Sequence, residues 1–143
     1  MSDKLKNLLA FGGISSLLFI ACQRTDTTPA DQVSISVNQS ARVGADVVVR
    51  ADSIQDSRCP VNVTCVWAGQ AKVKLELSKG NDNQTLRLIL DGGGVRNTPN
   101  RADSTQVSLA GQNYKVILRE VNPYPGTGPV GQPQTAIVQV TPL

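Results

Sequence analysis

The chain contains no histidine, and only 3% of its 143 residues are aromatic. Without histidine, a Ser-His-Asp or Cys-His catalytic site is impossible, and a zinc site loses one of its common ligands. Because aromatic side chains are scarce, the core must consist mainly of Val, Leu, Ile and Ala. A chain of this length is expected to form one domain whose core is large enough to fold alone.

Charge is also sparse. The chain has 14 Lys and Arg residues against 11 Asp and Glu residues, and they are scattered along its length. No segment forms the basic stripe that nucleic-acid binding requires, so no nucleic-acid partner is predicted. Carboxylates expected in turns or on outward strand positions, surrounded by solvent, are Asp46, Asp52, Asp56, Glu76, Asp82, Asp91, Asp103 and Glu120. A catalytic carboxylate pair is therefore not expected. The prediction is a protein that is not an enzyme and has no cofactor and no metal site.

The first 21 residues have the organisation of a secretory signal peptide. Lys4 and Lys6 form a basic start, and residues 8–20 form a short apolar run that includes two glycines and two serines. A membrane-spanning helix needs about 20 apolar residues, so this run instead matches the apolar region of a signal peptide. We expect residues 1–21 to be removed during export.

The signal ends in Leu18-Phe19-Ile20-Ala21-Cys22, which resembles a bacterial lipobox, with Phe19 where leucine is usual. The resemblance implies cleavage before Cys22 and attachment of acyl chains such as palmitate. Two or more acyl chains hold a protein stably at a membrane, whereas one is marginal. We therefore predict a membrane-anchored lipoprotein of the bacterial cell envelope, in the outer membrane or facing the periplasm. An ordinary cleavable signal with an incidental cysteine is the alternative.

Residues 22–31 are polar, rich in threonine and interrupted by Pro29, and are predicted to be a flexible tether. Beyond them, apolar and polar residues alternate with the period of a β-strand. Strands are predicted over residues 33–37, 43–49, 71–77, 86–90, 106–109, 114–121 and 135–141. The prediction for residues 32–143 is one all-β domain, a single antiparallel β-sandwich of immunoglobulin-like general shape with about seven strands. A small β-barrel is the alternative.

The segments between these strands are predicted to be turns and loops. Residues 38–42 are expected to be a hairpin connection, and residues 51–58 a loop or a short helical turn. Residues 95–104 are expected to be a polar loop. Residues 122–133 are predicted to be a surface loop, because their prolines lack the backbone donors that a central strand needs.

Cys59 and Cys65 remain once Cys22 is assigned to lipid. Three cysteines in an exported protein leave one unpaired, and an oxidising compartment favours a disulfide between the other two. A redox pair usually shows C-x-x-C spacing and a zinc site needs more ligands, so both are the less favoured alternatives. Trp67 is predicted to pack over the bridge or to cap the core, and Gly69 to allow a close approach of the chain.

The cysteine segment, together with two later segments of the chain, resembles a family of small, mostly uncharacterised bacterial exported or lipoprotein domains. The residues that carry the resemblance are Asp56-Ser57-Arg58-Cys59-Pro60, Val63, Cys65, Trp67-Ala68-Gly69, Tyr114-Lys115-Val116-Ile117-Leu118 and Asn122-Pro123-Tyr124-Pro125. The resemblance covers most of residues 52–140. It implies a small exported β domain and no particular activity.

Two functions are consistent with these features. In the first, a non-catalytic lipoprotein presents loops of its β-sandwich to an envelope protein or a glycan. The candidate binding residues are Pro60, Val61, Asn62, Trp67 and Tyr124. Tyr124 lies between two prolines and is expected to be either exposed or folded back onto the sandwich. In the second, the stiff segment Pro60–Thr64 inserts into a protease or other hydrolase as an inhibitor, because a rigid loop loses less entropy on binding.

Three triplets resemble an O-glycosylation signal of some bacterial lipoproteins: Asp26-Thr27-Thr28, Asp52-Ser53-Ile54 and Asp103-Ser104-Thr105. Such triplets also arise as Asx and Ser turns, which is the alternative interpretation. A mass equal to that of the lipidated polypeptide alone would exclude glycosylation.

Overall fold

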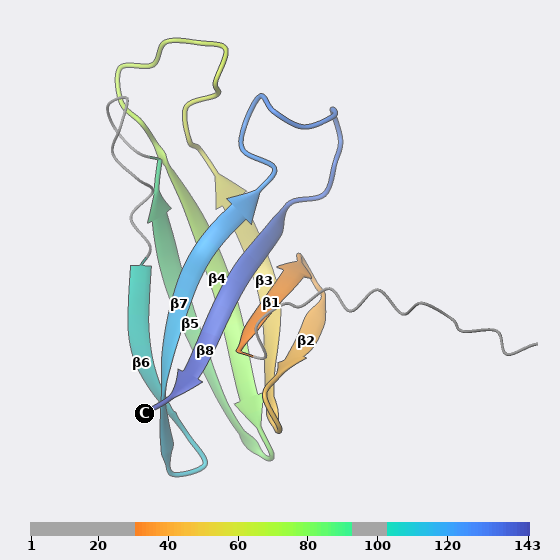
Figure 1. Ribbon diagram of the computed structural model, residues 1–143, viewed down its shortest axis with the longest axis vertical. Helices are drawn as coiled ribbons and strands as arrows, with labels where there is room; N and C mark the ends of the chain where they lie inside the picture. Colours follow the sequence, from red (N-terminus) through yellow and green to blue (C-terminus); the bar gives the residue numbers. More distant parts are fainter. Residues whose placement is uncertain (1–30, 93–102) are drawn as a thin grey trace, which may run out of the picture.

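Two four-stranded antiparallel sheets pack face to face in a β-sandwich (Figure 1). The computed structural model describes residues 31–92 and 103–143. Across the first sheet lie, in order, β1 (Gln32–Ser36), β8 (Thr135–Pro142), β7 (Gln112–Asn122) and β6 (Asp103–Leu109). Across the second lie β2 (Ser40–Val43), β3 (Val47–Asp56), β4 (Gln70–Lys79) and β5 (Asp82–Asp91). The prediction of an all-β sandwich is confirmed, with eight strands in these residues in place of about seven.

The strands follow one another around the sandwich in chain order. β2 to β5 are consecutive neighbours in one sheet, the chain then crosses to β6, and β7 and β8 follow beside it. β8 also pairs with β1, so the first and last strands lie side by side. Within residues 31–92 and 103–143 the two sheets stay separate, so the alternative of a closed barrel is not what forms.

The core between the sheets is almost wholly aliphatic. In β4 and β5 the inward side chains alternate as predicted, and the fully or nearly fully buried ones are Ala71, Val73, Leu75, Leu77, Leu86, Leu88 and Leu90. Each large aliphatic side chain contributes roughly 1.5–3 kcal/mol when it leaves water. Tyr114 of β7 is the one aromatic residue among the buried side chains of the described ranges. The composition therefore predicted the core correctly.

The expected strand over residues 43–49 is divided in two. β2 ends at Val43 and β3 begins at Val47, and the turn between them includes Gly44 with a φ of 62°. A left-handed residue ends a strand, and glycine adopts that conformation without strain. The valines on either side continue the same alternation, which is why the pattern alone suggested one strand.

The predicted loop or helical turn over residues 51–58 is wrong for residues 51–56 and correct for Ser57 and Arg58, which lie in a loop. β3 continues to Asp56, with a bulge between Ala51 and Ser53. Beyond the bulge, each residue to Asp56 lies opposite a residue of β4. Pairing with a strongly apolar strand keeps a polar segment extended, because strand preference depends on neighbours more than on the residue itself.

The predicted hairpin connection over residues 38–42 is also wrong. β1 pairs with β8 and β2 pairs with β3, so the chain crosses from one sheet to the other between them. Hydrogen bonds hold the crossing to the β3 bulge: Asn38 N–H donates to Ala51 O at 2.7 Å, and Ala51 N–H donates to Gln39 O at 3.1 Å. Alternation shows which face of a strand is buried but not which strand lies beside it.

Two of the three hydroxyl triplets lie in strands rather than in the turns offered as the alternative. Asp52-Ser53-Ile54 lies at the bulge of β3, and Asp103-Ser104-Thr105 begins β6. The third triplet lies outside the described residues, as do Cys22 with its signal, residues 22–30 of the predicted tether, and residues 95–102 of the predicted polar loop.

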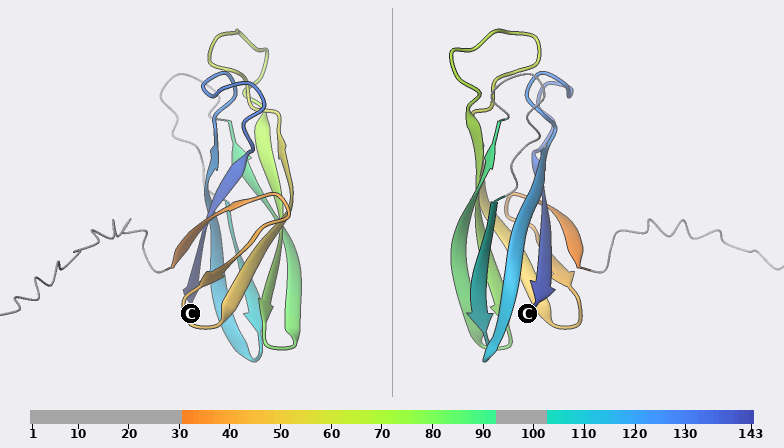
Figure 2. Two further views of the ribbon diagram at one scale, coloured as in Figure 1. Left: turned by 90° about the vertical axis from the view of Figure 1, so that its right-hand side faces the viewer. Right: turned by 60° about the vertical axis from the view of Figure 1, so that its left-hand side comes forward.

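The long loops gather at one end of the sandwich. The β3–β4 loop and the β7–β8 loop project from the same end, and the β4–β5 and β6–β7 turns lie at the opposite end (Figures 1 and 2). The β7–β8 loop, residues 123–134, is the predicted proline-rich surface loop, and that prediction is confirmed. Across residues 31–92 and 103–143, no helix has the length and apolar character needed to traverse a membrane.

Candidate functional site

The β3–β4 loop, residues 57–69, projects beyond the end of the sandwich (Figure 1). Within it Cys59 and Cys65 form a disulfide, with 5.9 Å between their Cα atoms. The predicted pairing is therefore confirmed. In the described part of the chain no group of three or more His, Cys, Asp or Glu side chains is arranged to hold a metal ion.

The root of this loop is closed by backbone contacts. Ser57 N–H donates to Gln70 O at 2.9 Å, and Cys59 N–H donates to Ala68 O at 2.8 Å. Gly69 has a φ of 70°, and a Cβ there would lie 1.9 Å from the carbonyl oxygen of Ser57. The predicted close approach at Gly69 is confirmed, and no other residue fits without moving the backbone.

A buried ion pair lies just below the loop. The Arg58 guanidinium donates from Nε to Asp56 Oδ1 at 2.8 Å and from Nη2 to Asp56 Oδ2 at 2.5 Å. Nη2 also donates to Val121 O of β7 at 2.7 Å, which ties the two sheets together. The Arg58 and Asp56 side chains are only 1% and 2% exposed. The expectation that Asp56 is surrounded by solvent is wrong, because a cation two residues away takes the place of water.

Tyr124 folds back onto this ion pair. Its ring centroid lies 4.5 Å from Arg58 Cζ, within the range of a cation–π interaction, and its hydroxyl donates to Gly92 O at 3.4 Å. Next to it, Val61 N–H donates to Pro125 O at 3.1 Å. Of the two placements expected for Tyr124, the structure therefore shows the folded-back one. We call the two loops joined in this way, residues 57–69 and 123–134, the apex.

Large apolar side chains of the apex point into solvent. The relative exposures are 61% for Val61, 54% for Val63, 100% for Val66 and 79% for Trp67. We call these four residues the apolar tip. The prediction that Trp67 packs over the bridge or caps the core is wrong. Arg58 and Tyr124 already fill the end of the core, and the disulfide itself lies outside the sandwich.

The apex is also free of charge apart from its buried arginine. No Asp, Glu, Lys or Arg occurs between Arg58 and Lys72, or after Glu120. The second loop adds one more exposed valine, Val130, with a relative exposure of 105%. Exposed apolar side chains gathered on two adjoining loops that carry no exposed charge are typical of an interaction site.

The structure brings four of the five candidate binding residues together in one loop. Pro60 is half-buried, Val61, Asn62 and Trp67 are exposed, and Tyr124 lies beneath them as a support. The sequence interpretation missed Val66, and it placed Val63 only in the inhibitor segment Pro60–Thr64. It also missed Arg58, whose partners are fixed only by the fold.

Comparison of the chain with protein-family models, with curated proteins and with solved structures returned no match. The arrangement of the apex is therefore the basis for a functional proposal.

Proposed function

We propose that the protein is a non-catalytic lipoprotein of the bacterial cell envelope and binds an envelope protein through its apolar tip. The lipobox at Cys22 supports the membrane anchor. The apex supports binding, because an apolar surface held rigid on a sandwich loses little entropy when a partner covers it.

The observation that carries the proposal is the full exposure of Val66 and the 79% exposure of Trp67 on a loop closed by a disulfide. These side chains add nothing to folding stability while they stay in water, whereas burying them against a partner contributes about 25 cal/mol of binding free energy per Å² of apolar surface. Tryptophan is also the residue type most enriched among binding hot spots. The expected partner surface is an apolar pocket or groove without charge.

A protein suits the tip better than a glycan. A glycan is recognised by many hydrogen bonds as well as by apolar contact, and the exposed polar side chains beside the tip are only Asn62 and Thr64 within the disulfide loop. The four side chains of the tip are hydrocarbon or indole surface. This favours the protein partner over the glycan partner for this part of the molecule.

Inhibition of a protease or other hydrolase is the second candidate function, favoured by the protruding, braced loop. Within the segment Pro60–Thr64, however, Val63 N–H donates to Pro60 O at 3.4 Å and closes a turn. Main-chain pairing with an enzyme's sheet edge needs an extended strand, so the turn would have to open. Assays against serine, cysteine, aspartic and metalloproteases test this function, and inhibition lost in Val61→Ser would establish it in place of the first.

The proposed function is tested by placing a photo-crosslinking amino acid at Val66 in the full-length protein in intact cells. Asn81, exposed in the β4–β5 turn at the opposite end, is the matched control position. We expect one defined protein adduct from position 66, none from position 81, and loss of the adduct when Trp67→Ser is added. Equal adducts from both positions, or an adduct that Trp67→Ser leaves unchanged, would refute binding through the tip.

The anchor is tested separately. Labelled palmitate should be incorporated into the full-length chain and not into Cys22→Ala, and the substituted chain should leave the membrane fraction. Absence of label from the unsubstituted chain would refute the lipoprotein assignment without touching the binding surface.

A further inference from the structure

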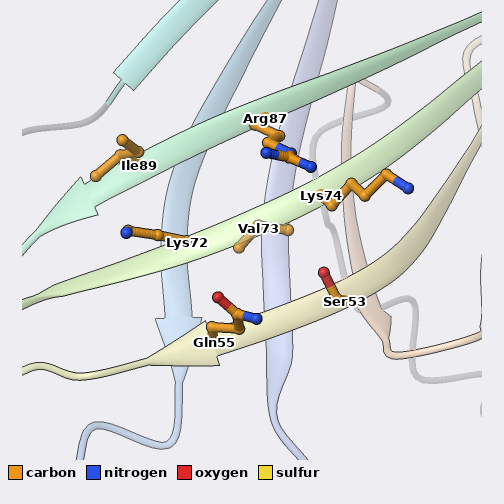
Figure 3. A pocket seen from close by; sticks show the side chains of 7 residues that line it. All are labelled: Ser53, Gln55, Lys72, Val73, Lys74, Arg87 and Ile89. Atoms are coloured by element: carbon orange, nitrogen blue, oxygen red, sulfur yellow. The ribbon is translucent and has the colours of Figure 1, made fainter.

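A hollow of about 370 Å³ lies on the outer face of the β3–β4–β5 sheet, in the half of the sheet nearer the apex. Its lining consists of Ser53 and Gln55 from β3, Lys72, Val73 and Lys74 from β4, and Arg87 and Ile89 from β5. Figure 3 shows side chains from three neighbouring strands around this part of the sheet. Its size lies at the lower end of the range for small-molecule sites.

Three basic residues line this hollow. Lys72 and Lys74 project from the same face of β4, and Arg87 of β5 lies directly opposite Lys74 in the register. Like charges directly opposite each other destabilise a pair of strands. The arrangement therefore weakens the free domain slightly, and an anion bound between the cations would remove that repulsion.

Acidic groups lie at two places near this hollow. Asp103 Oδ2 accepts a hydrogen bond from the Ile89 backbone N–H at 3.0 Å. Asp52 accepts from Arg50 at 2.7 Å and lies 3.5 Å from Lys74 Nζ. Lys72 and Arg87 form no ion pair with any residue in 31–92 or 103–143. Lys72 and Arg87, diagonal neighbours in the register, are thus left without a direct ion-pair partner among these residues.

Polar and apolar groups complete the lining. Ser53 lies opposite Lys74, and Gln55 lies opposite Lys72, so a hydroxyl and an amide stand beside the cations. Ile89, opposite Lys72 on the other side, is 38% exposed and adds an apolar wall. Cations, hydrogen-bonding groups and a hydrocarbon surface together match a ligand that carries carboxylates, hydroxyls and a C–H face.

We propose that this hollow binds an acidic oligosaccharide whose sugar rings carry carboxylate groups, with Lys72 and Arg87 binding a carboxylate, Ser53 and Gln55 its hydroxyls, and Ile89 a ring face. This site is separate from the apolar tip and goes beyond the proposed function.

Two other polyanions fit the hollow less well. Single-stranded nucleic acid needs aromatic platforms for its bases, and no aromatic residue lines the hollow. An anionic membrane is bound by basic residues together with apolar side chains that enter the lipid. Here the apolar residue Ile89 lies in a depression rather than on a projection.

Binding of tetragalacturonate to the full-length protein, measured by calorimetry at low and moderate salt, tests the proposal. Its methyl ester keeps the same sugar skeleton without the charges and is the ligand control. Lys72→Gln and Arg87→Gln are the test variants. Lys115→Gln removes the same charge from an exposed position on β7 of the other sheet and is the matched protein control.

We expect saturable binding of the tetragalacturonate and none of the ester. Lys72→Gln and Arg87→Gln should each weaken binding by at least about tenfold, as loss of a charge-assisted hydrogen bond does, while Lys115→Gln leaves it unchanged. Equal loss in Lys115→Gln would show attraction to net charge alone and overturn the site. Binding to phosphatidylglycerol vesicles that depends on Lys72 and Arg87, without binding of the oligosaccharide, would overturn the ligand class.

Discussion

Truncation of Arg58 should destabilise the protein more than loss of any exposed charge. Arg58→Ala removes both hydrogen bonds to Asp56, the bond to Val121 O and the cation–π contact with Tyr124. It also leaves the Asp56 carboxylate, 2% exposed, without its cation. Breaking one partner out of a buried ion pair costs about 3–5 kcal/mol, a large share of a typical stability of about 5–15 kcal/mol.

The structure sets limits on that figure. Asp56 retains two donors after the truncation, the Arg58 backbone N–H at 3.1 Å and Gln134 Nε2 at 3.2 Å. These contacts compensate part of the carboxylate's lost hydration, so the lower half of the range is expected. With an m-value of about 2 kcal/mol per M in urea, the unfolding midpoint should fall by roughly 1.5–2 M.

Unfolding in urea followed by far-ultraviolet circular dichroism measures this effect. Tryptophan fluorescence is a poor probe here, because Trp67 is already 79% exposed in the folded state. Arg50→Ala is the matched control, since Arg50 pairs with Asp52 at 2.7 Å but its side chain is 51% exposed. Exposed pairs add little to stability, so the Arg50→Ala midpoint should stay close to that of the unsubstituted protein.

Two further variants separate the ion pair from simple packing. Arg58→Lys keeps the charge but not the two-pronged geometry, and should lose less than Arg58→Ala. The double variant Asp56→Asn with Arg58→Met removes both charges, and should lose less than the sum of its single variants because the two residues interact directly. If Arg58→Ala moved the midpoint no more than Arg50→Ala, the buried pair would not be what joins the two loops to the sandwich.

Three other predictions follow from local features. Gly69→Ala should destabilise the fold more than Gly80→Ala does, as measured by thermal unfolding. Both glycines have a positive φ, which costs alanine about 1–2 kcal/mol, but of these two only Gly69 has a position where a Cβ would meet backbone atoms. Equal losses of stability would refute the close approach at Gly69. The double variant Cys59→Ser with Cys65→Ser should lower stability by about 2 kcal/mol, which is the chain-entropy value for so short a loop. Its far-ultraviolet circular dichroism spectrum should remain that of the folded β-sandwich. Loss of that spectrum would show that the apex organises the fold. The hydrogen bond from Arg50 lowers the pKa of Asp52 in the folded state. The stability that Asp52 adds relative to Asp52→Asn should therefore be present above about pH 4 and disappear as the pH falls through that lowered pKa. A stability difference between the two proteins that stays constant down to low pH would contradict this.

Much of the fold could be predicted from alternation alone. β4, β5 and β8 carry inward aliphatic residues at every second position, and β7 alternates as far as its bulge after Leu118. The place of all four in the sequence is close to what the pattern indicates. The end of β3 could not be predicted in this way. Between Asp52 and Asp56 the only apolar residue is Ile54, so the segment shows no alternation. Its extended conformation depends on pairing with β4, which is a property of the fold rather than of the segment.

Part of the candidate site could likewise be predicted from the sequence, and part could not. Counting cysteines predicted the disulfide, because pairing depends on the compartment and on the number of thiols. Whether Trp67 is buried depends on what else fills the end of the core, and that place belongs to Arg58 and Tyr124, which are 66 residues apart in the chain. No local pattern brings such a pair together, so the exposure of the tip was visible only in the structure.

The contacts that hold the apex lie below the side chains that it exposes. Arg58, Tyr124 and Gly69 fix the two loops to the sandwich through buried or backbone contacts. Val66 and Trp67 lie beyond them and contribute almost nothing to folding, since they stay in water. Substitutions at the tip should therefore cost the domain little stability. That separation is the physical reason for proposing that the tip binds and that the residues beneath it give support.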